Sequence, residues 1–303
     1  MRILFITATR LGDAVISTAL LRHLCAVYPD ARFTIACGEV AAGVFTRVPG
    51  LERLVMVTKK RWDAHWLGLW AELVGTRFDL AIDLRGSALT FFLPVKKRAI
   101  MRGGRRPGLR LHHVAGVLDL EPSPLPMAFF NEADVAAARS FLPAGRALIG
   151  LGPTANWDGK IWPVENFAAL YREIAREMPD AIPVVFGGPG AMERELARPL
   201  LEALPGAIDA VGQFDLPVVA ASLARMRIFV GNDSGLMHLA ASAGAPVLGL
   251  FGPTSAAEYA PSGVMARAVL ADGEPGGAPM SALSVEKVLL AARDLLSRDA
   301  VAA

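Results

Sequence analysis

Short apolar runs alternate with helix-length amphipathic segments from one end of this chain to the other. In the first half, the pattern predicts strands at 3–8, 33–36, 54–57 and 78–84, and helices near 14–28, 63–75 and 132–141. In the second half, it predicts strands at 147–151, 182–187, 227–230 and 246–250, and helices near 163–177, 190–204, 234–243 and 284–297. Strands that alternate with helices are typical of parallel sheets covered on both faces, so we predict the α/β class.

The alternation breaks at 142–146, where a proline and a glycine separate two elements, and it restarts with the apolar run at 147–151. A chain of 303 residues has about the length of two domains. We therefore predict two doubly wound domains, at 1–143 and 144–303, with a cleft between them. Because ligands of such sheets bind beyond the carboxyl ends of the strands, we expect the functional residues in the loops that follow strands.

Composition excludes several classes of protein. The chain is 53% hydrophobic and 20% charged, which is unlike a disordered scaffold. No apolar run reaches the roughly 18 residues that a membrane-spanning helix needs, and the sequence opens with a strand-like run rather than a secretory signal. Two cysteines, Cys25 and Cys37, make neither a disulfide framework nor a zinc site. We predict a cytoplasmic protein without a metal site.

Charge is distributed unevenly along the chain. The net charge is only +2, but the segment 87–118 contains no acidic residue. Its basic residues are Lys96, Lys97, Arg98, Arg102, Arg105, Arg106 and Arg110, followed by His112 and His113. Such a segment indicates an anionic partner, either an acidic substrate or an anionic membrane surface, or else a solvated loop. Nucleic acid is disfavoured, because the segment lacks interleaved aromatic residues and any known nucleic-acid-binding module.

The end of the first predicted strand carries a candidate catalytic acid. The run TATRLGDA, at 7–14, places Gly12 and Asp13 where a strand passes into a helix. Asp13 is either the N-cap of that helix or a carboxylate presented to a substrate as a general base. Its spacing alone leaves both interpretations open.

A second group of candidate residues follows the strand at 227–230. In GNDSGLMHLAA, at 231–241, Asp233 or Ser234 caps a helix whose first backbone N–H groups can bind a phosphate. His238, on the same helix, is either a packing residue or an acid or base. The next strand ends in FGPT, at 251–254, a second turn of this kind. Two neighbouring anion-binding turns suit a diphosphate.

Two further loops follow strands of the second half. The loop GPTANWDGKIWP, at 152–163, contains Lys160, which can neutralise a phosphate, and two tryptophans, Trp157 and Trp162, that we interpret as core residues. The loop GGPGAMERE, at 187–195, offers Glu193 or Glu195 to the hydroxyl groups of a ribose.

Tryptophans recur at every fourth position from Trp62 through Trp66 to Trp70, which forms a single stripe on the predicted helix near 63–75. Such a stripe either packs against the sheet or forms an apolar face that meets a lipid or another protein.

Three of these segments together resemble glycosyltransferase family 9, the ADP-heptose:lipopolysaccharide heptosyltransferases. They are RLGDAVISTALLRHL, DGKIWPVENFAAL, and GNDSGLMHLAA followed by a strand and FGPT. The resemblance implies a GT-B fold, with two Rossmann-like doubly wound domains that face each other across a cleft. It also implies an inverting transfer of heptose from ADP-heptose to the inner core of lipopolysaccharide, with the acceptor on the N-terminal domain and the donor on the C-terminal domain.

The resemblance also assigns roles to residues. It implies that Asp13 is the catalytic base and that Lys160 contacts the donor phosphate. The predicted donor site comprises Thr154, Glu193, Asn232, Asp233, Ser234, Gly235, His238 and Thr254. The predicted acceptor site comprises Gly12, Lys96, Arg102, Arg105 and Arg106. One departure is that the segment 17–20 lacks the proline that often follows the opening aspartate in similar sequences.

These assignments define the expected partners. The nucleotide-sugar is a co-substrate, and no cofactor is expected, because a lysine and a helix N-terminus can stabilise the leaving diphosphate. An anionic glycolipid acceptor and peripheral contact with the inner membrane would account for the basic segment. Two alternatives remain: a GT-B transferase that uses another nucleotide-sugar for another surface glycan, and a nucleotide-sugar-binding protein without catalytic activity.

Overall fold

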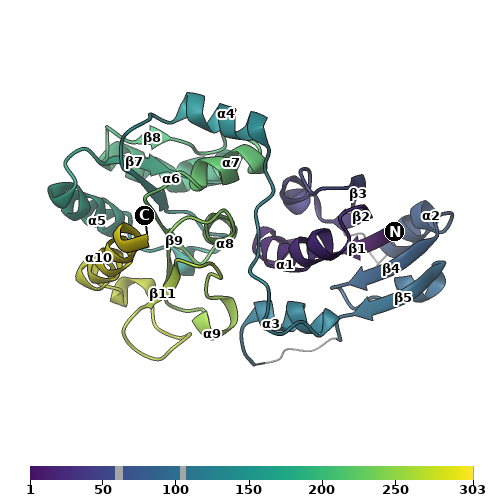
Figure 1. The fold of residues 1–303 in the computed structure, drawn as a ribbon. Coiled ribbons are helices and arrows are strands. Elements are labelled where there is room, and N and C mark those ends of the chain that lie inside the picture. Colours follow the sequence, from purple (N-terminus) through teal and green to yellow (C-terminus); the bar gives the residue numbers. More distant parts are fainter. Residues whose placement is uncertain (59–63, 103–106, 303) are drawn as a thin grey trace. The chain divides into compact units, whose positions relative to one another are not determined.

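The computed structural model describes residues 1–58, 64–102 and 107–302. The chain forms two compact units, Met1–Phe129 and Phe130–Ala303. Each unit consists of a parallel sheet with helices on both faces (Figure 1), which confirms the predicted α/β class. In the part of the chain that the structure describes, no helix is both long and apolar enough to cross a membrane.

The sheet of the first unit has five strands in the order β3-β2-β1-β4-β5, all parallel. The strands are β1 (Arg2–Ile6), β2 (Arg32–Cys37), β3 (Leu51–Met56), β4 (Phe78–Asp83) and β5 (Val95–Ile100). The helices are α1 (Leu11–Val27), α2 (His65–Leu73) and α3 (Arg110–Ala115), with short 3-10 turns η1 (Glu39–Val44), η3 (Leu89–Phe92) and η4 (Gly116–Leu118). The direction of winding reverses between β1 and β4, which is typical of a Rossmann-like sheet.

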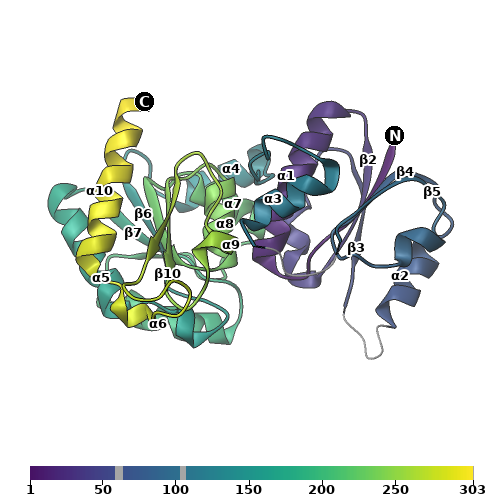
Figure 2. The ribbon, with the colours of Figure 1, turned by 90° about the horizontal axis from the view of Figure 1, so that it is seen from below.

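The strand β1 is apolar along nearly its whole length because both faces of the sheet are covered. Leu4 and Ile6 pack in one cluster with Leu69 and Leu73 of α2. The alternate residues of the strand point to the opposite face, which α1 covers (Figure 2). The sheet therefore lies between α1 and α2, and the loops at its carboxyl edge are left open.

The sheet of the second unit has six parallel strands in the order β11-β10-β9-β6-β7-β8. They are β6 (Leu148–Gly152), β7 (Ile182–Val185), β8 (Ile208–Asp209), β9 (Ile228–Asn232), β10 (Val247–Phe251) and β11 (Ala266–Leu270). The α-helices are α4 (Glu132–Phe141), α5 (Val164–Glu177), α6 (Ala191–Ala203), α7 (Leu216–Leu223), α8 (Gly235–Ser242), α9 (Ala256–Tyr259) and α10 (Val285–Ala302), with 3-10 turns η5 (Asp158–Lys160) and η6 (Met280–Ala282). Here the winding reverses between β6 and β9.

The boundary between the units lies earlier than the predicted boundary at 143/144, because α4 belongs to the second unit. Arg225, just after α7, donates hydrogen bonds to the carbonyl oxygens of Ala138, Leu142 and Pro143, at 2.8 to 3.0 Å. These bonds fix the end of α4 and the turn after it to the rest of the second unit. The proline and glycine at 143–145 therefore mark a turn within a domain rather than a linker between domains.

The basic segment differs from its expected structure. The sequence pattern predicts no strand or helix within 87–118, but this segment contains both β5 and α3. β5 is an edge strand whose residues 96–98 are exposed, so its polar sequence does not show the apolar pattern of a central strand.

Candidate active site

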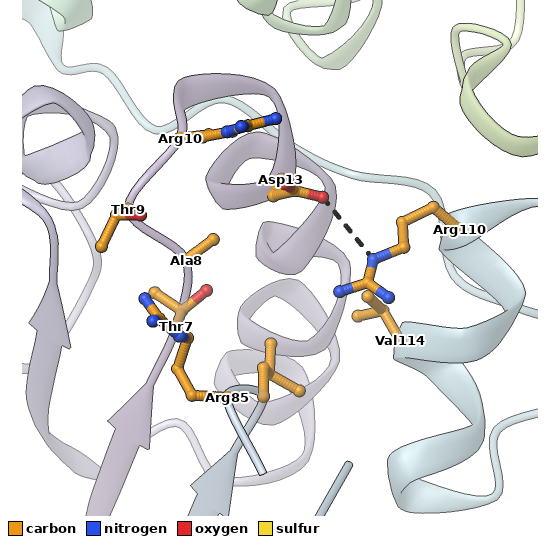
Figure 3. A pocket seen from close by; sticks show the side chains of 9 residues that line it. Thr7, Ala8, Thr9, Arg10, Asp13, Arg85, Arg110 and Val114 are labelled. Atoms are coloured by element: carbon orange, nitrogen blue, oxygen red, sulfur yellow. Dashed lines mark ion pairs between the residues drawn. The ribbon is translucent and has the colours of Figure 1, made fainter. Parts of the chain in front are cut away.

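A cavity of about 330 Å³ lies at the carboxyl ends of β1 and β4, where the winding of the first sheet reverses. Ligands of doubly wound sheets bind at this position. The cavity is lined by Thr7, Ala8, Thr9, Arg10, Asp13, Leu84, Arg85, Arg110 and Val114 (Figure 3).

The loop that forms one wall of the cavity is fixed by its neighbours. The backbone N–H of Thr7 donates to the carbonyl oxygen of Ala36 at 2.9 Å, which extends the pairing of β1 with β2. Gly38, after β2, lies so close to Thr9 that a Cβ at this glycine would be 2.6 Å from the Thr9 Cα. The Thr7 hydroxyl also donates to Ser17 Oγ at 2.9 Å, which ties the loop to α1. The cavity wall is therefore held from both the sheet and the helix.

Asp13 is not the N-cap of α1, so this interpretation was wrong. The helix begins at Leu11 with Arg10 as its N-cap, and Asp13 is the third helical residue. Its side chain lies in the cavity, 25% exposed, and Oδ1 is 3.5 Å from Nε of Arg110, the first residue of α3. Among the described residues, neither of these two atoms has a hydrogen-bond partner. The pair is thus a loose ion pair between two buried atoms, and a ligand in the cavity can reach only the exposed part of the Asp13 side chain.

Three arginines share the cavity with this single carboxylate, so the cavity is suited to an anionic ligand. Arg85 follows β4 directly, and its backbone N–H donates to the buried carboxylate of Asp83 at 2.8 Å. The N–H and hydroxyl groups of Ser87 donate to the same carboxylate at 2.9 and 2.6 Å. Burial raises the pKa of Asp83, although these hydrogen bonds act in the opposite direction. Asp83 therefore holds the loop that carries Arg85.

Sequence reasoning did not assign Arg85 or Arg110 to the site. The position of Arg85 at a strand end was a usable signal, because ligands bind beyond the carboxyl ends of strands. Arg110 belongs to the basic segment that indicated an anionic partner, but its position beside Asp13 could not be predicted, since it arises only from the packing of α3 on α1.

The predicted acceptor residues do not gather in this cavity. Lys96 is the second residue of β5 and pairs at 2.6 Å with Asp79, the second residue of β4, so it lies at the amino end of the sheet. Arg102 is exposed just after β5, at the carboxyl edge, but does not line the cavity. Gly12 lies in the first turn of α1 beside Asp13. Arg105 and Arg106 lie outside the described residues.

The second unit has its own site where the winding reverses between β6 and β9. Asn232 ends β9 and is fully buried. Its Oδ1 accepts from the backbone N–H of Trp162 at 3.0 Å, and its Nδ2 donates to the carbonyl oxygen of Pro153 at 2.9 Å. Asn232 therefore joins the loop after β6, which carries the buried Thr154, to the loop after β9.

A tight ion pair lies beside this asparagine. Lys160 Nζ is 2.7 Å from Asp233 Oδ2, and the two side chains are only 20% and 8% exposed. The pair brings together two residues that the sequence had placed in separate loops. The Lys160 ammonium group, held in place by Asp233, can bind a phosphate of a ligand.

The N-terminus of α8 follows immediately. Ser234 is its N-cap residue and Gly235 its first helical residue. The buried Oγ of Ser234 has no hydrogen-bond partner among the residues described. The unpaired N–H groups of a helix start and a free hydroxyl suit an anion. Thr254 lies half-buried in the loop after β10, the strand next to β9, whereas His238 is buried within α8.

Glu193 and Glu195 take different positions at the start of α6. Glu193 Oε2 accepts from the backbone N–H of Gly188 at 2.9 Å, so this carboxylate lies over the loop after β7. Glu195 pairs with Arg198 on the exposed side of the helix. The structure thus places Glu193, and not Glu195, at a carboxyl strand end.

The two tryptophans of the loop after β6 differ in burial. Trp162 is fully buried and donates from Nε1 to the carbonyl oxygen of Leu283 at 2.8 Å, so its prediction as a core residue is confirmed. Trp157 is 53% exposed, and its prediction as core is wrong. Its ring lies against Gly159 of the turn η5, where a Cβ would be only 2.6 Å from the ring.

Neither cysteine is placed for chemistry. Burial raises the pKa of the Cys37 thiol to about 12 and raises that of Cys25 as well, which favours the unreactive neutral thiol. Within the described ranges, no group of three or more His, Cys, Asp or Glu side chains is arranged to hold a metal ion.

Comparison with known proteins gives consistent matches. Residues 110–287 match the family described as glycosyltransferase family 9 (heptosyltransferase). The chain is 26% identical to lipopolysaccharide heptosyltransferase 2 of Salmonella typhimurium, over 84% of each chain.

Solved structures show the same fold. The E. coli ADP-heptose lipopolysaccharide heptosyltransferase II superposes with a TM-score of 0.80 at 23% identity, over 99% of both chains. A second E. coli heptosyltransferase, solved with ADP, has a TM-score of 0.76 at 22% identity, over 97% of this chain and 100% of the other. These likenesses confirm the predicted GT-B fold with two Rossmann-like domains.

Proposed function

The chain belongs to glycosyltransferase family 9, the heptosyltransferases, and we propose that it transfers heptose from ADP-heptose to an inner-core lipopolysaccharide acceptor of the Kdo-lipid A type. In this proposal the acceptor binds to the first unit, the nucleotide-sugar binds to the second, and the anomeric carbon is inverted.

One observation carries the proposal: Asp13 presents a partly exposed carboxylate in a cavity at the strand ends. As the acceptor hydroxyl attacks the anomeric carbon, its proton passes to Asp13. The bond from the anomeric carbon to the diphosphate oxygen breaks, and its electron pair leaves with ADP. Attack from the face opposite the leaving group inverts the configuration, as in inverting glycosidases.

Arg110 orients this base. Its guanidinium lies 3.5 Å from Asp13 Oδ1 without forming a hydrogen bond that would occupy that oxygen. We propose that the two other cavity arginines, Arg10 and Arg85, bind anionic groups of the acceptor. A sugar acid or a phosphorylated sugar would satisfy them, and both are consistent with an acidic glycolipid.

The donor diphosphate is assigned to the second unit. Lys160 and the N–H groups at the start of α8 would stabilise the charge that develops on the leaving group, so the proposal needs no cofactor or metal. Asp233 positions the Lys160 ammonium through their 2.7 Å contact. Thr154 and Thr254 lie in the two loops that flank this diphosphate site. Glu193 is proposed to bind the ribose.

The test is release of ADP by purified protein given ADP-heptose, with and without a Kdo-containing lipid A acceptor. We expect release that depends on the acceptor. In Asp13→Asn, release should fall by about 10²- to 10⁴-fold, the range for loss of a general base, while ADP-heptose still binds. The matched control is Asp30→Asn, which changes an exposed carboxyl of the same unit and should leave release unchanged.

Other outcomes would contradict parts of the proposal. Undiminished turnover by Asp13→Asn would remove the base assignment. Binding of ADP-heptose without release, with any acceptor offered, would favour a non-catalytic binding protein. Binding of a UDP- or GDP-sugar in place of ADP-heptose would favour a transferase for another glycan.

A further inference from the structure

The outer side of the first unit carries an apolar surface. Leu69 and Leu73 of α2 are buried against the sheet. At other positions of the same helix and just after it, Leu67, Trp70 and Val74 are 72%, 39% and 38% exposed. Their spacing of three and four residues places them on one side of the helix. The helix α2 therefore carries large apolar residues at exposed positions as well as buried ones, unlike an ordinary surface helix, whose exposed residues are polar.

Two exposed phenylalanines extend this surface. Phe91 and Phe92, in η3, are 65% and 69% exposed. Trp70 Nε1 donates a hydrogen bond to the carbonyl oxygen of Phe92 at 2.9 Å, so α2 and η3 lie side by side. We call these five residues, Leu67, Trp70, Val74, Phe91 and Phe92, the outer face. An exposed group of large apolar residues is typical of an interaction site.

The segment that carries the outer face is richer in basic than in acidic residues. Between residues 64 and 98 the chain carries five Lys or Arg residues and three acids. Of the acids, Asp83 is fully buried, Asp79 pairs with Lys96, and Glu72 pairs with Arg53. The Arg98 guanidinium lies 5.7 Å from the centre of the Phe91 ring and donates to the carbonyl oxygens of Thr90 and Leu93. Its positive charge is thus displayed next to an exposed aromatic ring.

The outer face is also connected to the cavity. Trp66, in the first turn of α2, has its ring 5.9 Å from the Arg85 guanidinium, and Arg85 lines the cavity. The helix runs from this contact along the sheet beside β4 and β5 (Figures 1 and 2). A molecule whose polar head occupies the cavity can therefore extend an apolar part along the outer face.

We propose that the outer face docks on an anionic lipid bilayer. Aromatic and aliphatic side chains enter the boundary between headgroups and acyl chains, while Arg98 and the basic excess of this segment are attracted to anionic lipids. A second copy of the chain would present the same positive charges and be repelled, whereas an anionic membrane attracts them. This choice of partner rests on the proposed function, because a glycolipid acceptor resides in a membrane.

Vesicle flotation without donor or acceptor tests this surface. We expect the wild-type chain to bind vesicles of phosphatidylcholine with roughly one third phosphatidylglycerol, and to bind pure phosphatidylcholine vesicles much more weakly. The double variant Phe91→Ser with Phe92→Ser should bind the anionic vesicles at least about tenfold more weakly. The control is Met192→Ser with Val264→Ser, which replaces residues of the second unit that are 78% and 89% exposed, and it should bind like wild type.

Three results would overturn the proposal. In the first, the wild-type chain does not float with anionic vesicles. In the second, the phenylalanine variant floats like wild type. In the third, light scattering shows that the wild-type chain self-associates and that the phenylalanine variant does not.

Release of ADP from ADP-heptose, with the acceptor dispersed in detergent, is measured in parallel. The phenylalanine variant should retain it, since neither residue lines the cavity. If neither the wild type nor any variant releases ADP, the proposed function is contradicted, but the flotation result stands unchanged.

Discussion

The two units have closely similar sheets but different ion pairs where the winding reverses. In the first unit, Asp13 and Arg110 are 3.5 Å apart, with side chains 25% and 32% exposed. In the second, Lys160 and Asp233 are 2.7 Å apart, with side chains 20% and 8% exposed. A loosely paired, partly exposed carboxylate is better suited to take a proton than a tightly paired, buried one, which is committed to its partner. The same fold thus holds a partly exposed, loosely paired acid in one unit and a buried, tightly paired acid in the other.

The largest effect on stability is expected from removing a partner of the buried pair. Lys160→Met leaves the Asp233 carboxylate buried without its cation, which should lower the free energy of unfolding by roughly 3 kcal/mol. Chemical denaturation followed by fluorescence measures this change. The double variant Lys160→Met with Asp233→Leu should regain part of the loss, because it removes the unpaired charge. An unchanged denaturation midpoint in Lys160→Met would show that the ion pair contributes little to stability.

The corresponding change in the first unit should affect turnover instead. Arg110→Met leaves Asp13 partly solvated, so the free energy of unfolding should change by less than about 0.5 kcal/mol. Because we propose that Arg110 orients Asp13 as the base, we expect kcat/KM to fall about tenfold, in keeping with a positioning residue rather than the base itself. Arg139→Met, an exposed arginine of the second unit, is the control. A loss of stability in Arg110→Met as large as that in Lys160→Met would show that both ion pairs stabilise the fold, which would contradict this distinction.

A pH dependence should distinguish Asp83 from both pairs. Burial raises its pKa in the folded state above the ordinary value of 3.8, so the folded state binds the proton more readily than the unfolded state does. The contribution of this group to stability is therefore largest at low pH and declines as the pH rises from 3.8 through the raised folded value. Denaturation midpoints across this window, for wild type and Asp83→Asn, should show the decline only in wild type. The same decline in both proteins would assign it to another group.

Local patterns were sufficient to find the main candidates in the sequence. Asp13, Lys160 and the turn at 232–235 all follow apolar strands, and the structure places them at carboxyl strand ends. These signals extend over a few residues, which is the range in which strand and helix periodicities act. The order of the strands was not predicted, and it comes from the structure.

Some short elements at sheet edges escaped prediction because their patterns are weak. β8 has two residues, and β5 exposes three consecutive basic side chains. Neither shows the continuous apolar run of a strand covered on both faces. The domain boundary was misplaced for a related reason, since the hydrogen bonds of Arg225 to the end of α4 join residues far apart in the chain.

The sequence of this protein was enough to indicate its α/β class, its strand-end loops and its family, because each depends on neighbouring residues. Packing alone brought Arg110 to Asp13, joined Lys160 to Asp233, and placed Lys96 at the far end of the sheet from the cavity. Packing also left Trp157 exposed and put Trp70 beside Phe92. These contacts join segments far apart in the chain, and their geometry exists only once the sheets and helices have packed.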